Sequence, residues 1–177
     1  FVRAKKINNF GIKYQYINSN KIHILGTPRY ENYFANRKKK LKSYFDFKYI
    51  LFVEGFGIQE NLEFFFKIIE KSLNNLKKKG INLKLIYRPH PWRKNQQNID
   101  VSIFKNIKLD PQLKYFYEKN LTNSAIQPDL DYYPSLIKNA SIIIAAPSTM
   151  VIESSIFWKK IILLAHDQEE DFGNYAY

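Results

Sequence analysis

The 177-residue sequence contains no cysteine, which excludes disulfide bonds and cysteine-based metal sites. It also has no apolar run long enough to span a membrane, because its most apolar stretches, SIIIAA, KIILLA and YILFV, have the length of strands. The first residues, FVRAKKINNF, lack the apolar core and the cleavage site of a signal peptide. A Walker loop and a His-Glu-x-x-His spacing are missing too. These absences predict no metal and no cofactor, and they favour a cytoplasmic setting.

The composition is that of a folded domain. Hydrophobic residues make up 45% of the chain and aromatic residues 16%, which excludes wholesale disorder, and the length suffices to bury a core. The missing initiator methionine and the abrupt ending DFGNYAY predict a piece of a longer polypeptide. We expect one domain over residues 21–177, preceded by an extension or interdomain segment over residues 1–20.

The formal net charge of +12 arises mainly from lysine. The densest runs are RKKKLK at 37–42 and LKKKG at 76–80, and both are compatible with solvated surface. The alternative is contact with an acidic partner or with an anionic membrane at its inner face, through Lys38, Lys39, Lys40 and Lys42. Aromatic and basic residues form no known nucleic-acid motif, so we expect no nucleic-acid partner.

Apolar periodicity predicts strands and helices that alternate along the chain. Strands are expected over residues 21–25, 48–53, 83–87, 141–145 and 160–164, with a further one near 107–109. Helices are expected over 59–79, closed by Gly80, over 129–140, and from Ser148 or Thr149 onward. Residues 92–125 show no clear pattern. Continuous isoleucine-rich strands that alternate with helices are typical of a doubly wound α/β fold with a parallel sheet, which is Rossmann-like.

The segment RPHP at 88–91 is an unusual end for a strand. Its two prolines remove backbone donors and fix φ on both sides of His90, so they stop the strand and hold an imidazole there. A plain turn with an exposed histidine is the alternative.

Two further polar interruptions, EGFG at 54–57 and APST at 146–149, also follow predicted strands. In an open parallel sheet the carboxyl ends of the strands form the ligand edge, so the three interruptions should converge. The start of the helix after Pro147 is suited to bind a phosphate through backbone amides and the hydroxyls of Ser148 and Thr149.

The other candidate ligands of that phosphate come from the first two interruptions. Gly55 and Gly57 would let the backbone approach a ligand, while Arg88 and His90 would add charge-assisted bonds to a diphosphate.

Glu153 lies inside the same helix among apolar neighbours. It is either an ordinary helical glutamate or an acceptor for ribose hydroxyls, which would imply a nucleotide rather than free phosphate. Ser154 and Ser155 are better explained by packing, and His23 and His166 by structural roles.

The stretch DLDYYPSLIKNASIIIAAPSTMVIESSIFWKKIILL resembles the C-terminal, donor-binding half of GT-B glycosyltransferases. Its shared features are a short helix, an apolar strand, Ser-Thr, a glutamate four residues after the threonine, and another strand. RPHP resembles the His-Pro motif of bacterial capsule and lipopolysaccharide transferases, and IHILGTPRYENYF is similar to a turn found in polyol-phosphate transferases and sugar 2-epimerases. The Gly-Lys-Pro usual after the helix is Trp158-Lys159-Lys160 here.

The resemblance implies that His90, Ser148 and Thr149 hold the donor phosphates, that Glu153 binds the ribose and that residues 125–131 contact the base. It also implies a metal-independent glycosyltransferase that makes surface carbohydrate from a nucleotide sugar. The acceptor domain, which usually carries the catalytic base, would be N-terminal and missing from this chain, so the fragment should be inactive alone. A non-catalytic nucleotide- or anion-binding module, or half of a nucleotide-sugar 2-epimerase, remains the alternative.

Overall fold

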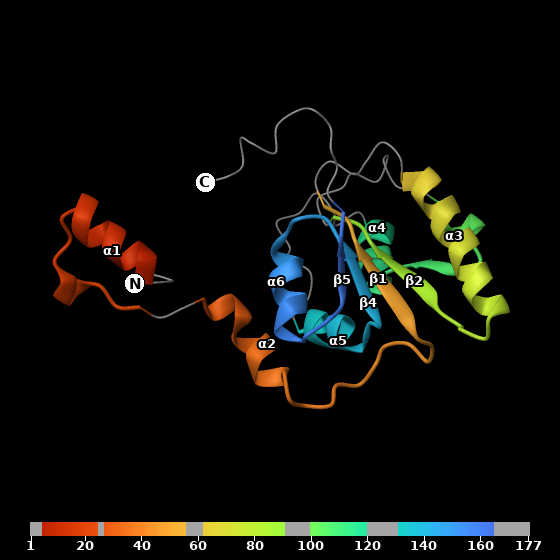
Figure 1. Ribbon diagram of the computed structural model, residues 1–177, viewed down its shortest axis with the longest axis horizontal. Coiled ribbons are helices and arrows are strands. Elements are labelled where there is room, and N and C mark those ends of the chain that lie inside the picture. The colour runs from red at the N-terminus through yellow and green to blue at the C-terminus, as the bar shows by residue number, and fades with distance from the viewer. Residues whose placement is uncertain (1–4, 25–26, 56–61, 91–99, 120–130, 165–177) are drawn as a thin grey trace. The chain divides into compact units, whose positions relative to one another are not determined.

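A computed structural model describes residues 5–24, 27–55, 62–90, 100–119 and 131–164 of the chain (Figure 1). The chain forms two compact units, Phe1–Lys39 and Lys40–Tyr177. Within the described residues, no helix has the length and apolar character that crossing a bilayer requires.

The regular elements in the described part of the first unit are helical. They are α1 (Lys5–Tyr14), the 3-10 turns η1 (Ser19–Lys21) and η2 (Pro28–Tyr30), and α2 (Glu31–Asn36). The strand predicted over 21–25 is wrong for the described part of that range, because Lys21 ends η1 and Ile24 makes only an isolated bridge. The physical reason is local: the Asn18 side chain accepts the Asn20 N–H at 3.0 Å, a turn that competes with extended backbone.

The second unit is built on a five-stranded sheet in which every neighbouring pair is parallel. Its strands are β1 (Tyr49–Val53), β2 (Lys84–Arg88), β3 (Ile107–Leu109), β4 (Ile142–Ala145) and β5 (Ile161–Leu163), in the order β3-β2-β1-β4-β5. Its helices are α3 (Leu62–Lys78), the 3-10 turn η5 (Val101–Ile103), α4 (Pro111–Glu118), α5 (Tyr132–Asn139) and α6 (Thr149–Ile156). The predicted doubly wound α/β fold is confirmed.

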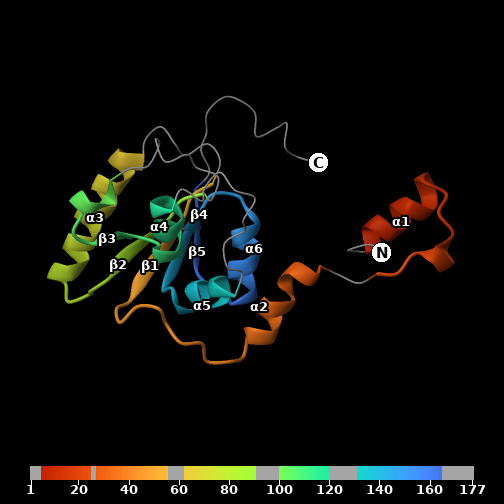
Figure 2. The ribbon, with the colours of Figure 1, turned by 180° about the vertical axis from the view of Figure 1, so that it is seen from behind.

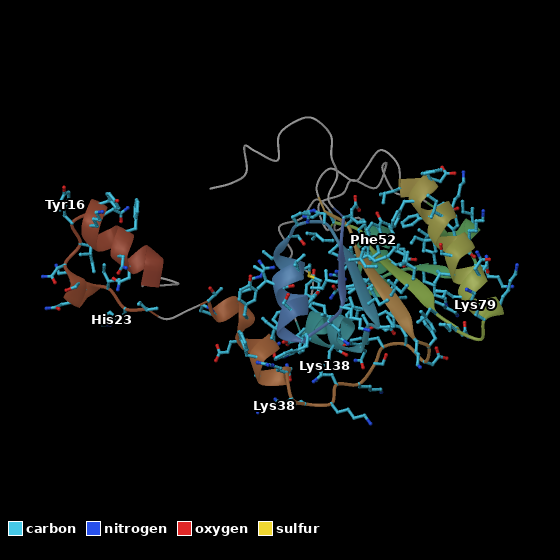
Figure 3. All side chains as sticks on the ribbon, in the orientation of Figure 1. Tyr16, His23, Lys38, Phe52, Lys79 and Lys138 are labelled. Carbon is cyan, nitrogen blue, oxygen red and sulfur yellow. The ribbon has the colours of Figure 1, made fainter. Side chains whose placement is uncertain are left out.

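The two faces of the sheet are covered by different helices, with α3 on one side and α5 and α6 on the other (Figures 1 and 2). Alternate side chains of β1 take part in each layer. Phe52 contacts Phe66 of α3 with ring centroids 6.0 Å apart, and it lies in the interior of the unit (Figure 3). Tyr49 points to the other face, where its hydroxyl donates to the Leu136 carbonyl of α5 at 2.6 Å. Strands β1, β2 and β4 are therefore buried on both sides, as their continuous apolar sequences predict, whereas Ile162 and Leu163 of the edge strand β5 are exposed.

The end of α3 follows the sequence prediction closely. Gly80 has φ +80°, a left-handed conformation in which glycine is favoured. Its N–H donates to the Lys77 carbonyl at 3.0 Å, and the Ile81 N–H donates to Leu76 at 3.0 Å. These bonds satisfy carbonyls at the helix end and turn the chain toward β2.

A close approach between the ends of β1 and β4 explains Gly55. A Cβ placed on Gly55 would lie 2.5 Å from the Cβ of Ala146, well inside contact distance. The sequence reading assigned this glycine to ligand approach, whereas in the structure its missing side chain makes room for a neighbouring strand end.

We expect Gly55→Ala to destabilise the chain by about 1–3 kcal/mol, because its added methyl overpacks the strand ends. Urea unfolding followed by circular dichroism measures the change. Adding Ala146→Gly to the same chain removes the clashing atom and should restore most of the loss. A single variant as stable as the parent would contradict the close packing.

Candidate functional site

The register of the sheet brings the ends of the three strands that precede the predicted interruptions to one edge. Val53 of β1 pairs with Arg88 of β2 on one side and with Ala145 of β4 on the other. The residues that follow these three positions therefore leave the sheet at the same level. The strand order also reverses here, since β2 and β4 flank β1 and continue in opposite directions. This is the position at which open parallel sheets bind ligands.

Glu54 occupies the centre of this edge, and the sequence reasoning did not name it. Its carboxylate is buried and its Oε2 accepts the Tyr87 hydroxyl at 2.6 Å and the His90 backbone N–H at 3.2 Å. Its own N–H donates to the Arg88 carbonyl at 3.0 Å. Glu54 thus ties the end of β1 to the segment that carries His90. An acid directly after five apolar strand residues was the signal that could have identified it.

His90 is half-buried just beyond the end of β2. Burial lowers the pKa of its imidazole below the ordinary value, because desolvation disfavours the charged form. At neutral pH the ring is therefore neutral and offers one N–H donor and one nitrogen acceptor. The following residue, Pro91, lies outside the described part of the chain.

Arg88 is buried, and its guanidinium is held by protein groups. It forms an ion pair with the buried Asp110, donates to Gln112 Oε1 at 2.9 Å, and stacks over the Tyr133 ring with 4.1 Å between Cζ and the ring centroid. Burial alone would lower the pKa of Arg88, but the Asp110 carboxylate and the Tyr133 contact outweigh it and raise that pKa. The sequence reading did not anticipate this ion pair.

Asp110 connects β3 with α4 and α5. Besides Arg88, its carboxylate accepts the Gln112 backbone N–H at 2.9 Å and the Tyr132 hydroxyl at 3.0 Å. Burial and the nearby carboxylate raise the pKa of Tyr132, which keeps its hydroxyl protonated as a donor. Three separate elements are therefore fixed around one buried carboxylate.

We expect Arg88→Met to destabilise the chain by about 3–5 kcal/mol, because it leaves the Asp110 carboxylate buried without its cation. Adding Asp110→Asn to this variant removes the uncompensated charge and should recover part of the loss. The exposed Lys108→Met is the control, with an expected change within about 0.5 kcal/mol. Chemical denaturation measures all three variants, and an Arg88→Met variant of parental stability would contradict the assignment.

The start of α6 is the open part of this edge. Ser148 is its N-cap, makes no side-chain hydrogen bond to the helix, and is exposed together with Pro147 and Thr149. The first backbone amides of a helix have no partner within it, so they and the helix dipole favour an anion at this position.

Glu153 lies one turn further along α6 and is buried. It is therefore not an ordinary exposed helical glutamate. Ser154 and Ser155 bond to their own helix, through Met150 and Val151 carbonyls at 2.6 and 2.8 Å. Gly57, His166 and residues 125–130 lie outside the described part of the chain. Among the described residues, no three His, Asp or Glu side chains gather as a metal site would require.

Trp158, at the position where the resembling family has glycine, has φ 59°. This left-handed conformation closes α6: the Lys159 N–H reaches back to the Ser154 carbonyl at 3.2 Å and the Trp158 N–H to Ser155 at 3.0 Å. A side chain with a Cβ is disfavoured in this conformation, whereas glycine adopts it without a steric penalty.

Trp158→Gly should stabilise the chain by about 1 kcal/mol, because glycine adopts this conformation without the steric penalty. The indole is 76% exposed, so little packing is lost. Trp158→Ala is the matched control, since it removes the indole but keeps a Cβ. Thermal unfolding compares the variants, and equal stability of the glycine and alanine variants would refute the explanation.

Comparison with known proteins adds a likeness of fold only. No family model and no curated protein matches the chain. Two structures of the wall teichoic acid polymerase TagF, soaked with CDPG for 30 and 15 minutes, match at 16% and 14% identity, with TM-scores of 0.48 and 0.49. A UDP co-structure of MnaA from S. aureus matches at 17% identity and a TM-score of 0.49. Each match covers 96% of this chain, but the chain spans only 38% to 43% of the length of those proteins.

Proposed function

We propose that this chain is the donor-binding half of a metal-independent GT-B glycosyltransferase, which binds a nucleotide-activated sugar for surface carbohydrate synthesis in the cytoplasm. The observation that carries the proposal is that the strands preceding Glu54, His90 and α6 end at one level, at the point where the strand order reverses. The sequence resemblance supports the same reading, because two of its motifs fall here: RPHP follows β2, and Ser148, Thr149 and Glu153 belong to the start and the first turns of α6.

In this proposal the donor diphosphate lies against the start of α6. The amides there and the hydroxyls of Ser148 and Thr149 supply hydrogen bonds, and the helix dipole favours the negative charge. His90 donates a further hydrogen bond from the end of β2. Its role is to stabilise the departing phosphate, where a fixed donor in a partly dry site is most effective.

The Glu153 carboxylate would accept hydrogen bonds from the ribose hydroxyls. Glu153 follows Thr149 by four residues, so the two lie on one face of α6. A carboxylate shielded from water is suited to accept hydrogen bonds from two adjacent hydroxyls.

Arg88 takes a different place from the direct phosphate contact that the sequence predicts. Its guanidinium holds Asp110 and Gln112, so we place it behind the site, where it fixes β2 and thereby His90. Glu54 and Gly55 act similarly from β1, through the hydrogen bond to His90 and the contact with Ala146.

The acceptor and the catalytic base belong to an N-terminal half in this proposal, so the chain alone should bind nucleotide weakly and transfer no sugar. A non-catalytic nucleotide-binding module and half of a 2-epimerase are the alternatives. Supplying an N-terminal half and assaying transfer distinguishes an enzyme from a module, whereas nucleotide binding alone does not.

A thermal-shift screen of CMP, CDP, UDP and GDP should identify one preferred nucleotide. With that nucleotide, His90→Ala should weaken binding by about one to two powers of ten, because a hydrogen bond to an ionised phosphate is worth roughly 1.5–3 kcal/mol. His23→Ala, which removes an exposed imidazole of the first unit, should bind like the parent. Calorimetric titration gives the affinities, and an unchanged His90→Ala affinity would refute the assignment.

The same titrations test the ribose contact when the affinities for the ribose and dideoxyribose forms of the nucleotide are compared. Glu153→Gln keeps the size of the side chain but removes the charge, so it should reduce discrimination between ribose and 2′,3′-dideoxyribose forms of the nucleotide. Unchanged discrimination would remove Glu153 from the proposed site while leaving the diphosphate contacts standing.

A further inference from the structure

The positive charge of this protein is concentrated at one end of the chain. Residues 1–45 contain 11 of the 28 basic residues and only one of the 16 acidic residues, a net charge of +10. The remaining 132 residues contain 17 basic and 15 acidic residues, a net charge of +2. A general bias toward lysine would raise the charge throughout, so it does not explain this distribution.

Three lysines of this segment are exposed to a partner. Lys38 and Lys40 are exposed, as is Lys42 after them, and Lys38 extends from the surface in Figure 3. Among residues 1–45 the one acidic residue is Glu31, so this segment carries little negative charge of its own. A cluster of this density creates a strong local field for an anionic surface.

Exposed aromatic and aliphatic side chains occur within the same segment. On α1, Phe10 and Tyr14 are one turn apart, 52% and 59% exposed, with ring centroids 5.0 Å apart. Lys13 lies over the Tyr14 ring, with its Nζ 5.1 Å from the centroid. Gly11 is buried, where a Cβ would touch Ile17 and Ile22. One side of α1 thus packs on the following residues, while Phe10 and Tyr14 stay exposed.

We propose that residues 1–45 dock this protein on the surface of an anionic lipid bilayer. The lysines attract the headgroups, and Phe10 and Tyr14 enter the interface, where aromatic side chains with neighbouring cations are favoured. A duplex nucleic acid would use the charge but would give no favourable place to the aliphatic Ile12 and Ile17, which are also exposed. The combination of charge with apolar side chains therefore favours lipid.

Vesicle sedimentation with the full chain tests the electrostatic part. Binding should be strong when about a third of the lipid is phosphatidylglycerol, weak with phosphatidylcholine alone, and lower at high salt. Replacing Lys38, Lys40 and Lys42 by glutamine should reduce the affinity by about tenfold to a hundredfold. The matched control removes the same charge from the end of α3, where Lys77, Lys78 and Lys79 are exposed, and should bind nearly like the parent. Equal losses in both variants would overturn the proposal, since a diffuse net charge would then suffice.

A second pair of variants tests the apolar part. Phe10→Ser with Tyr14→Ser should remove most of the binding that persists at high salt, because that fraction depends on apolar burial rather than on charge. Phe64→Ser with Tyr115→Ser removes two comparably exposed rings from α3 and α4 and should leave it unchanged. A salt-resistant fraction that survives the α1 change would contradict the role of α1.

Two other results would also overturn the proposal. One is equal binding to neutral and anionic vesicles, and the other is tighter binding to duplex DNA or RNA than to anionic vesicles under the same salt conditions. The proposal does not depend on nucleotide binding: the vesicle variants leave Ser148, His90 and Glu153 unchanged, so failure of one assay does not imply failure of the other.

Discussion

The arrangement of the second unit depends on the register of β1 between two parallel neighbours. Val53 pairs with Arg88 and with Ala145, so three strands end at one level. The chain leaves the sheet at this level after each of the three strands. Moving any of these strand ends would break the backbone hydrogen bonds that pair the strands. The tight contact between Gly55 and Ala146 is a consequence of that level. What the site contains is therefore decided by which residues follow the strands.

Buried charged side chains near this edge hold the strands and helices of the candidate site in place. Burying Glu54, Arg88 and Asp110 is unfavourable by itself, and hydrogen bonds and one ion pair compensate for it. In return each group makes at least one contact with an element that is distant in sequence. Glu54 links β1 to the segment after β2, and Asp110, at the end of β3, contacts Arg88 of β2 and Tyr132 of α5. The position of His90 thus depends on a carboxylate from another strand.

The sequence predicted the sheet because its strands are continuous apolar runs, which is the pattern expected of strands covered on both faces. It failed at 21–24, which follow a turn that the Asn18 side chain stabilises. It also missed α4, although Asp110 followed by Pro111 is a typical helix start. The sequence predicts Arg88 as a ligand from its place at a strand end. It cannot show the partner Asp110, because that residue is 22 positions away and only the fold brings the two together.

The distribution of charge separates two tasks. Residues 46–177, which carry the proposed nucleotide site, have a net charge of only +2, so a long-range field contributes little to holding an anion there. Recognition in that unit must come from groups at contact distance: the amides at the start of α6 and the neutral imidazole of His90. Such contacts demand accurate placement, which the buried hydrogen bonds of Glu54 and Asp110 provide. The first 45 residues have the opposite character, since a dense charge attracts any anionic surface without fixed geometry. The strand edge in residues 46–177 is thus suited to a small ligand held by exact contacts. Residues 1–45 are suited to an extended anionic surface.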